Sequence, residues 1–277
     1  MTITTEKTAP AAQQAANRQM PSPRRKVLFG PIHPQGHRIT LYGPGGIGKS
    51  TLASGAPGPV AFIDLDESMP VLRQQLAAER EIRIVSGVST WQDLRDVLHA
   101  DGWVDTKTIV IDSVTKAEEL AGAWVLANVP LENGKKAQRL EDYGWGKQFG
   151  HIYDTFLAML GDLDAHVRAG RHVILIAHDC TTEVPNPAGA NWLRYEPRLQ
   201  SPASGKNSIR LRVREWCDHV LFCGYDVDVQ GGKGTGRGTR TIYPVELPHC
   251  MAKSRVADTA MSLIKGDSSI WTNIIKP

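Results

Sequence analysis

The amino-acid sequence predicts an α/β fold in which helices flank a mostly parallel central sheet. Short apolar runs alternate along the chain with longer segments of helical character. Such runs are typical of strands that a parallel sheet buries on both faces. A glycine-rich stretch at residues 43–50 separates a strand-like run from a helix-like run. The length of 277 residues suits one large domain with short extensions, or two small domains.

The expected strands and helices follow one another in turn. The strands share short runs of apolar and β-branched residues, at 37–42, 60–63, 82–85, 108–111, 173–177, 219–222 and 240–245. Five helices are expected. The first begins at Ser50, the second and third cover 70–78 and 90–100, the fourth ends near residue 127, and the fifth covers 150–168. Thr90 and Asp93 predict a cap at the start of the helix at 90–100, and Gly170 marks the stop of the last helix.

Three segments divide the chain. Residues 1–30 are rich in Thr, Ala, Gln and Pro and lack periodic apolar positions, so we expect a disordered tail. Residues 31–256 form the expected core, and residues 257–277 form a short C-terminal extension. The stretches expected as loops within the core lie at 129–149, 180–209 and 231–238.

The composition excludes several classes of protein. The net charge of +3 is mild, so any surface that binds nucleic acid must be local. No apolar run approaches the length of a membrane span, and the N-terminus has no apolar signal core. The four cysteines are Cys180, Cys217, Cys223 and Cys250. They form no C-x-x-C pair, which favours reduced thiols. We therefore expect a cytoplasmic protein without membrane association.

Residues 43–50 match the pattern G-x-x-x-x-G-K-[ST] of a phosphate-binding loop. The glycines let the backbone turn tightly and aim N–H groups at phosphate oxygens. We expect Lys49 to reach the β- and γ-phosphates and the Ser50 hydroxyl to ligate Mg²⁺. The expected nucleotide-binding residues are Gly43, Pro44, Gly45, Gly46, Ile47, Gly48, Lys49, Ser50 and Thr51. An ordinary glycine-rich turn is the alternative interpretation.

Asp112 ends a buried strand, where a carboxylate would hold Mg²⁺ through a bound water opposite Ser50. The alternative is a helix cap formed by Asp112, Ser113 or Thr115. Thr115 and Glu118 resemble a capping box, because they stand three residues apart at the start of a helix.

Three further side chains are candidates for chemistry at the γ-phosphate. Asp66 and Glu67 follow the strand at 60–63, and we expect one of them to orient the attacking water. A solvated acidic turn is the alternative. His178 follows the strand at 173–177, where it either senses the γ-phosphate or only bonds locally.

Taken in order, these motifs resemble the core of the RecA-like recombinases. Within that group the chain is similar to phage-encoded RecA-like P-loop ATPases, which include single-strand annealing ATPases, over about residues 37–256. The family has Glu where this chain has Asp66, and often Gln where it has His178. The resemblance implies an ATPase that uses ATP and Mg²⁺, binds single-stranded DNA, and supports phage recombination or strand annealing in the host cytoplasm. It also implies other copies of the chain and a single-strand-binding protein as partners.

Lys253 and Arg255 resemble the K-x-R pair that reaches the nucleotide of a neighbouring subunit in RecA-like assemblies. Cations placed against the γ-phosphate stabilise developing charge, and supplying them in trans couples hydrolysis to assembly. Alternation along a strand would put both side chains on one face. A solvated basic pair is the alternative.

Basic and aromatic residues interleave in the stretch at 180–209, and the corresponding loop of RecA-like recombinases contacts single-stranded DNA. The expected DNA-binding residues are Trp192, Arg194, Tyr195, Arg198 and Lys206. The alternative is a β-hairpin in which Trp192 and Tyr195 are packing anchors. Weaker candidates for DNA binding lie at 135–147 and 231–240.

Two other functions remain compatible with the motifs. A non-hydrolysing module could use ATP as an assembly switch, since the chain lacks an unambiguous catalytic Glu. An NTP-driven loader could act on a protein partner instead of DNA. A GTPase is disfavoured because the chain has no N-K-x-D motif, and a small-molecule kinase because it shows no evident lid.

Overall fold

The computed structural model describes residues 27–31 and 33–275 of the chain. Most of the predicted disordered tail, residues 1–30, therefore lies outside the described residues. The chain divides into two units, Met1–His33 and Pro34–Pro277. In the first unit the described residues form no helix or strand, and the helices and strands given below belong to the second unit.

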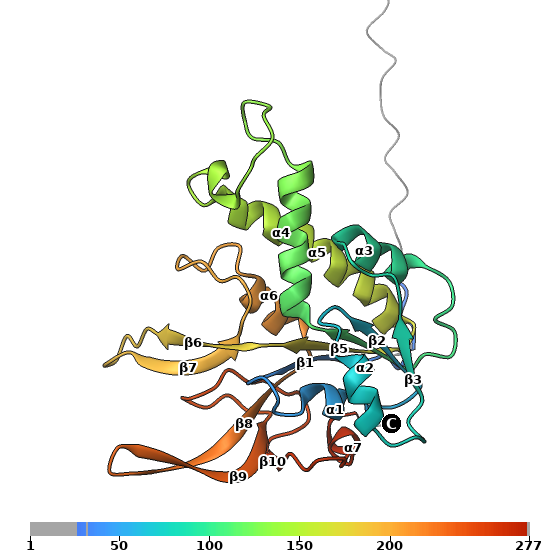
Figure 1. Cartoon of the computed structure of the whole chain (residues 1–277), viewed down its shortest axis with the longest axis vertical. Coiled ribbons are helices and arrows are strands. Elements are labelled where there is room, and N and C mark those ends of the chain that lie inside the picture. The colour runs from blue at the N-terminus through green and yellow to red at the C-terminus, as the bar shows by residue number, and fades with distance from the viewer. Residues whose placement is uncertain (1–26, 32, 276–277) are drawn as a thin grey trace, which may run out of the picture. The chain divides into compact units, whose positions relative to one another are not determined.

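An eight-stranded sheet forms the centre of the second unit, in the order β10-β9-β8-β1-β5-β4-β2-β3 (Figure 1). Strands β8, β1, β5, β4, β2 and β3 run parallel, and β9 and β10 continue the β8 edge in antiparallel pairs. The strand bounds are β1 Arg38–Tyr42, β2 Val60–Asp64, β3 Ile82–Val85, β4 Thr108–Asp112, β5 His172–Ala177, β8 His219–Gln230, β9 Lys233–Tyr243 and β10 Met261–Ser262. The predicted mostly parallel α/β sheet is confirmed.

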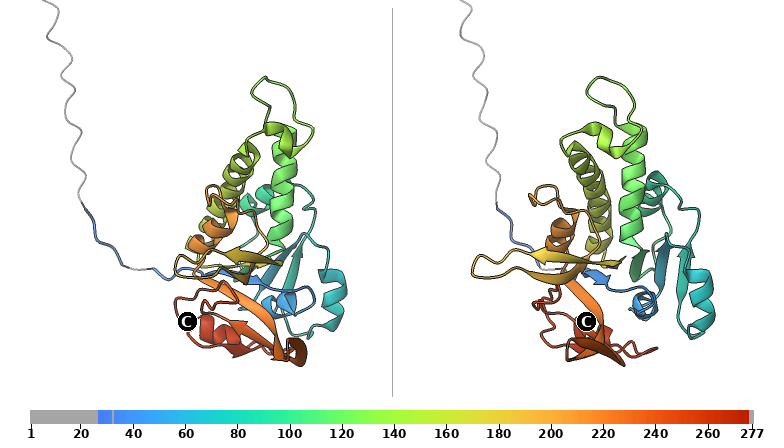
Figure 2. Two further views of the ribbon diagram at one scale, coloured as in Figure 1. Left: turned by 90° about the vertical axis from the view of Figure 1, so that its left-hand side faces the viewer. Right: turned by 60° about the vertical axis from the view of Figure 1, so that its left-hand side comes forward.

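Helices cover both faces of this sheet, as the two side views in Figure 2 show. One face packs against α3 Trp91–His99, α4 Val114–Asn128, α5 Lys147–Arg168 and α6 Ile209–Trp216. The other face packs against α1 Lys49–Ala53, α2 Met69–Leu72 and α7 Ile270–Ile274. Side chains alternate between the two cores, so Ile109 and Ile111 of β4 join the first and Val110 joins the second. This two-sided burial explains why the strands are continuous apolar runs.

The sequence predicts the cap of α3 and offers three candidates, Asp112, Ser113 and Thr115, for the cap of α4. The predicted capping box of α3 is confirmed, because Thr90 Oγ1 accepts from Asp93 N at 3.1 Å and Asp93 Oδ2 accepts from Thr90 N at 2.8 Å. The box predicted from Thr115 and Glu118 is wrong. Ser113 caps α4 instead, since its Oγ accepts from Lys116 N at 3.2 Å.

The sequence predicts a loop at 180–209, and the structure corrects this prediction. Strands β6 Asp179–Val184 and β7 Trp192–Pro197 pair as an antiparallel hairpin, and α6 follows from Ile209. These short strands contain many polar residues because much of the hairpin surface faces solvent. No continuous apolar run in the sequence therefore indicates them. The hairpin of the alternative interpretation is present, and binding of DNA by Trp192 and Tyr195 stays a prediction.

Smaller corrections concern three other segments. Most of the glycine-rich stretch 231–238 belongs to β9, since backbone pairing needs no side chain, and the turn lies at Gly231 and Gly232. The helix expected at 70–78 is only α2 followed by a 3₁₀ turn, η1 Arg73–Gln75. The stretch at 129–149 contains a second 3₁₀ turn, η2 Leu140–Tyr143, and the start of α5.

Candidate nucleotide-binding site

Residues 43–50 connect β1 to α1 in a tight turn. Gly43, Gly46 and Gly48 have φ values of 150°, 75° and 109°, in the region that favours glycine. A Cβ at Gly43 would lie 2.1 Å from the carbonyl oxygen of Cys223 on β8, so the backbone of the loop passes directly against the neighbouring strand. The sequence of the loop is therefore the one that this backbone path requires.

Lys49 begins α1, and its side chain folds back over the loop. The residue is 7% exposed, and its Nζ donates to Gly43 O at 2.7 Å and to Pro44 O at 3.0 Å. Burial lowers the pKa of Lys49, while the nearby Cys223 and the carboxylates Asp112, Asp179 and Asp66 act in the opposite direction. The loop thus holds an ammonium group at its centre. Phosphate oxygens can replace the two carbonyl oxygens as acceptors of its hydrogen bonds.

Ser50 and Asp112 meet beside this lysine. Ser50 Oγ donates to Asp112 Oδ2 at 2.5 Å, and Asp112 is 4% exposed at the end of β4. Burial raises the pKa of Asp112 to about 6, and the hydrogen bond from Ser50 opposes this rise.

A hydroxyl and a carboxylate are hard oxygen donors of the kind that Mg²⁺ accepts. Among residues 27–31 and 33–275, no three His, Cys, Asp or Glu side chains gather in a metal cage. This donor set fits Mg²⁺, which is usually held by one or two protein groups together with phosphate oxygens and waters.

The strand order brings the remaining candidates to the same edge of the sheet. Strand β5 lies between β1 and β4, so His178 at its end stands between the phosphate-binding loop and Asp112. Asp66 follows β2, and its backbone N donates to Asp112 O at 3.1 Å. His178 Nε2 lies 3.5 Å from Asp66 Oδ2. The carboxyl ends of parallel strands thus gather one ammonium, two carboxylates and one imidazole.

A cavity of about 440 Å³ opens beside this pair of side chains. Its lining includes Asp66, Glu67, His178 and Arg198. Glu67 has a φ of 54°, which is uncommon for a residue with a side chain and fixes the direction of the acidic turn. A water molecule in this cavity would meet both candidate carboxylates.

A separate cleft of about 390 Å³ lies along the other side of the phosphate-binding loop. It is lined by Lys49, Ser50 and Thr51, by Arg240 of β9, and by residues 263–267 after β10. Arg240 and residues 263–267 carry no sequence motif that marks them as parts of this site. The described part of the extension, residues 257–275, also packs against α1, since the indole Nε1 of Trp271 donates to Leu52 O at 2.9 Å.

Comparison with known families agrees with this geometry. A family model described as an AAA domain matches residues 35–256.

The chain belongs to this AAA domain family. No curated protein sequence matches the chain. Solved structures that resemble it include a KaiC-like protein, PH0186, from the hyperthermophilic archaeon Pyrococcus horikoshii OT3. That structure is 18% identical, with a TM-score of 0.41 over 76% of this chain and 79% of the other. Family and site together identify a P-loop ATPase domain, a class that binds nucleotide and generally uses Mg²⁺.

Lys253 and Arg255 lie at the opposite edge of the sheet of this AAA domain. Lys253 pairs with Val220 near the start of β8, and its Nζ donates to the carbonyls of Arg214, Glu215 and Cys217. Arg255 is 65% exposed and its Nε donates to Asp218 Oδ1 at 2.8 Å. The length of a strand, about 15 Å, separates this edge from the phosphate-binding loop of the same chain. Neither cation therefore reaches the nucleotide site of its own chain.

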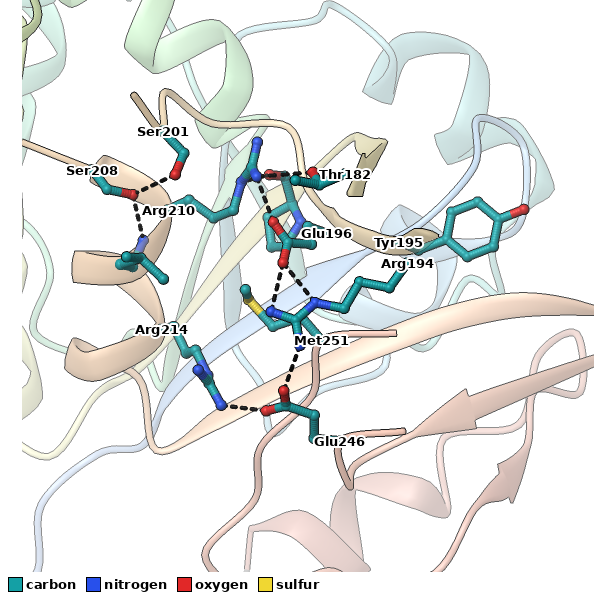
Figure 3. A network of polar contacts seen from close by, with 12 residues as sticks. Thr182, Arg194, Tyr195, Glu196, Ser201, Ser208, Arg210, Arg214, Glu246 and Met251 are labelled. Carbon is teal, nitrogen blue, oxygen red and sulfur yellow. Dashed lines mark hydrogen bonds and ion pairs between the residues drawn. The ribbon is translucent and has the colours of Figure 1, made fainter. Parts of the chain in front are cut away.

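The predicted DNA-binding residues fall into different environments. Arg194 is 12% exposed, because it pairs with Glu196 and with Glu246 (Figure 3). The ring of Tyr195 stacks on Phe222 with centroids 5.1 Å apart, and Trp192 Nε1 donates to Pro248 O at 2.7 Å. Both aromatic side chains remain partly exposed, and Lys206 is exposed. Arg198 lines the cavity beside His178 rather than the outer face of the hairpin. The structure thus assigns Arg194 to an internal network.

Hydrogen bonds join His178 to the segment that follows the hairpin. His178 N donates to Thr115 Oγ1 at 3.1 Å, and Arg198 N donates to His178 O at 2.8 Å. Gln200 N then donates to both carboxylate oxygens of Glu118, at 3.0 and 2.9 Å. This chain of contacts runs from the edge of the candidate site along α4.

Glu118 gives a prediction about pH. Burial raises the pKa of this carboxyl to about 7, and the bond from Gln200 opposes the rise. A raised folded-state pKa means that stability is present at low pH and is lost between about pH 4.5 and pH 7. Glu118→Gln keeps an acceptor for Gln200 but cannot ionise. Relative to the wild type, we expect the free energy of unfolding of this variant, measured in urea, to rise by about 2.5 kcal/mol between pH 5 and pH 8.

The matched control is Glu119→Gln, because Glu119 is exposed and pairs with Lys116 on the same helix. This control should follow the wild type at both pH values. A constant difference between Glu118→Gln and the wild type from pH 5 to pH 8 would show that Glu118 is ionised throughout.

Among the described residues, no helix is long and apolar enough to cross a membrane.

Proposed function

We propose that this chain is a Mg²⁺-dependent ATPase that binds single-stranded DNA and supports phage-type recombination or strand annealing. The observation that carries the enzymatic part is the meeting of five side chains at one sheet edge. They are the Lys49 ammonium, the bonded pair of Ser50 and Asp112, and the neighbouring pair of Asp66 and His178. An ordinary glycine-rich turn would not need this arrangement.

Each group has a distinct role in hydrolysis. Mg²⁺ held at Ser50 and Asp112 would neutralise charge on the phosphates. Lys49 binds the β- and γ-phosphate oxygens, and the N–H groups of residues 43–50 cradle them. Asp66 or Glu67 orients the attacking water in the adjacent cavity. His178 senses the γ-phosphate, because it contacts Asp66 and bonds through its backbone to the segment beyond the hairpin.

Lys253 and Arg255 serve a neighbouring copy of the chain in this proposal. Their distance from the phosphate-binding loop of their own chain supports a role in trans. Arg255 is exposed and can exchange Asp218 for a phosphate at little cost, since exposed ion pairs contribute little to stability. Lys253 is bonded to three carbonyls, so it would position the segment that carries Arg255. Assembly would then be a condition of rapid turnover.

The DNA-binding part of the proposal rests on the exposed aromatic residues of the hairpin. Trp192 and Tyr195 are partly exposed, and the hairpin begins directly after His178. Aromatic faces stack on unpaired bases without sequence preference. A single-strand-binding protein would be a further partner, since it covers the same substrate.

A non-hydrolysing assembly switch is the second candidate. The carboxylate of Asp66 faces His178, with 3.5 Å between Oδ2 and Nε2. The side chain of Asp66 is also shorter than the Glu found at this position in the ATPases that the chain resembles. If neither Asp66 nor Glu67 activates water, ATP would act only by its presence.

The two exposed tryptophans give a test of DNA binding. Trp192→Ala removes a stacking platform, and we expect it to weaken binding of a labelled oligo-dT by about 5- to 100-fold at about 50 mM salt with MgATP. Trp145, in the weaker candidate stretch at 135–147, is fully exposed and supplies the control. Trp145→Ala should bind as the wild type does, by fluorescence anisotropy. Wild-type protein that binds no oligonucleotide at this salt would contradict DNA binding, and a loss confined to Trp145→Ala would assign it to residues 135–147.

A further inference from the structure

Arg240 extends from the sheet onto the phosphate-binding loop. Its Nη1 donates to Ile47 O at 2.8 Å, and the same atom would lie 3.2 Å from a Cβ at Gly48. The guanidinium therefore rests on the loop itself, although 193 residues of sequence separate Arg240 from Ile47. Such a contact places a permanent positive charge beside the residues that cradle phosphate.

Two neighbouring strands fix the position of this arginine. Arg240 is the register partner of Tyr225 on β8, and its carbonyl oxygen accepts from Leu263 N at 2.8 Å. The side chains of Arg237 and Thr239 bond to Asp228 and Asp226 of β8, on the other face of the hairpin. Arg240 thus points away from these acidic partners and toward the cleft that it shares with Lys49, Ser50 and Thr51.

The bond to Ile47 uses one of the five N–H donors of the guanidinium, and the others can serve a ligand in the cleft. A planar fork of donors suits phosphate oxygens. The cleft also shares no lining residue with the cavity that contains Asp66 and His178, within the described chain. Because the attacking water must reach the γ-phosphate from that cavity, the cleft faces the remainder of the nucleotide.

We propose that Arg240 binds the α- or β-phosphate of the nucleotide, as a cation that the chain supplies to its own site. This inference rests on the proposed nucleotide site and adds a residue to it. The charge that Arg240 meets is present in both ADP and ATP. The contact therefore strengthens binding of both nucleotides equally and does not select the triphosphate. In this it differs from His178, which responds only to the γ-phosphate.

The test compares Arg240→Ala and Arg240→Lys with a matched control, Arg237→Ala. Arg237 lies on the same strand, but its partner is the exposed Asp228 and it does not line the cleft. Titration calorimetry gives the dissociation constants of MgADP and MgATP. We expect Arg240→Ala to weaken both by about tenfold, with the ratio of the two unchanged, as for one charged hydrogen bond. Arg240→Lys should recover part of the affinity, and Arg237→Ala should bind as the wild type does.

Unchanged affinity of Arg240→Ala for MgADP would overturn this inference and leave the proposed ATPase standing. A loss confined to MgATP would also overturn it, since it would place Arg240 at the γ-phosphate. Weaker binding together with a lower unfolding temperature of the nucleotide-free variant would assign Arg240 to holding the loop. Wild-type protein that binds neither nucleotide would overturn both the inference and the proposed function.

Discussion

Replacing Lys49 with alanine is expected to lower the rate of ATP hydrolysis by at least about 100-fold. Lys49 is the cation at the centre of the phosphate-binding loop, and its Nζ is already aimed by the carbonyls of Gly43 and Pro44. Its loss removes the positive charge that meets the transferring phosphoryl group. The turnover number with saturating MgATP, from phosphate release, is the quantity to measure. Lys107→Ala is the control, because Lys107 is exposed and precedes β4 at the far edge of the sheet.

The same variant tests the role of Arg255 in trans. Lys49→Ala lacks a working nucleotide site but still carries Arg255, whereas Arg255→Ala retains the nucleotide site. We expect each variant to hydrolyse ATP slowly when alone and a mixture of the two to recover activity. A mixture whose rate equals the sum of the separate rates would contradict action in trans.

Glu196→Ala is expected to cost about 3–5 kcal/mol of the free energy of unfolding. Glu196 is 5% exposed and Arg210 is 9% exposed, and the carboxylate bridges Arg210 to Arg194 (Figure 3). Removing it leaves a buried guanidinium without its partner, between the hairpin and α6. Chemical denaturation monitored by tryptophan fluorescence gives the free energy.

Glu215→Ala is the matched control, because Glu215 and Arg212 form an exposed pair on α6. This substitution should change the free energy of unfolding by less than about 0.5 kcal/mol. A Glu196→Ala variant within about 1 kcal/mol of the wild type would show that the network does not hold the hairpin.

The parallel sheet could be predicted because its strands are buried on both faces, so each is a continuous apolar run. The phosphate-binding loop could be predicted because its backbone path requires glycine at set positions. The hairpin of β6 and β7 has no such signal. Its strands carry charged and polar residues that a buried network satisfies. The interleaved basic and aromatic residues predict a DNA contact at Arg194, and the local sequence does not show that Glu246, 52 residues away, pairs with it.

Contacts between distant segments account for the other differences. Nothing in the local sequence around Arg240 indicates that it rests on Ile47, since only the order of the strands brings them together. Ser113 caps α4 because the helix begins at Val114, and Thr115, inside the first turn, bonds to His178 and Arg198 instead. Residues 263–267 of the C-terminal extension complete the cleft, although they carry no motif.

Single-turnover hydrolysis with protein in excess over radiolabelled MgATP tests the central claim most directly. The protein concentration should be high enough for assembly, and the assay should be run with and without oligo-dT. We predict that all bound ATP becomes ADP and phosphate in one phase that requires Mg²⁺ and disappears in Lys49→Ala. Bound ATP that is recovered intact under all these conditions would contradict the account and identify a nucleotide switch that does not hydrolyse.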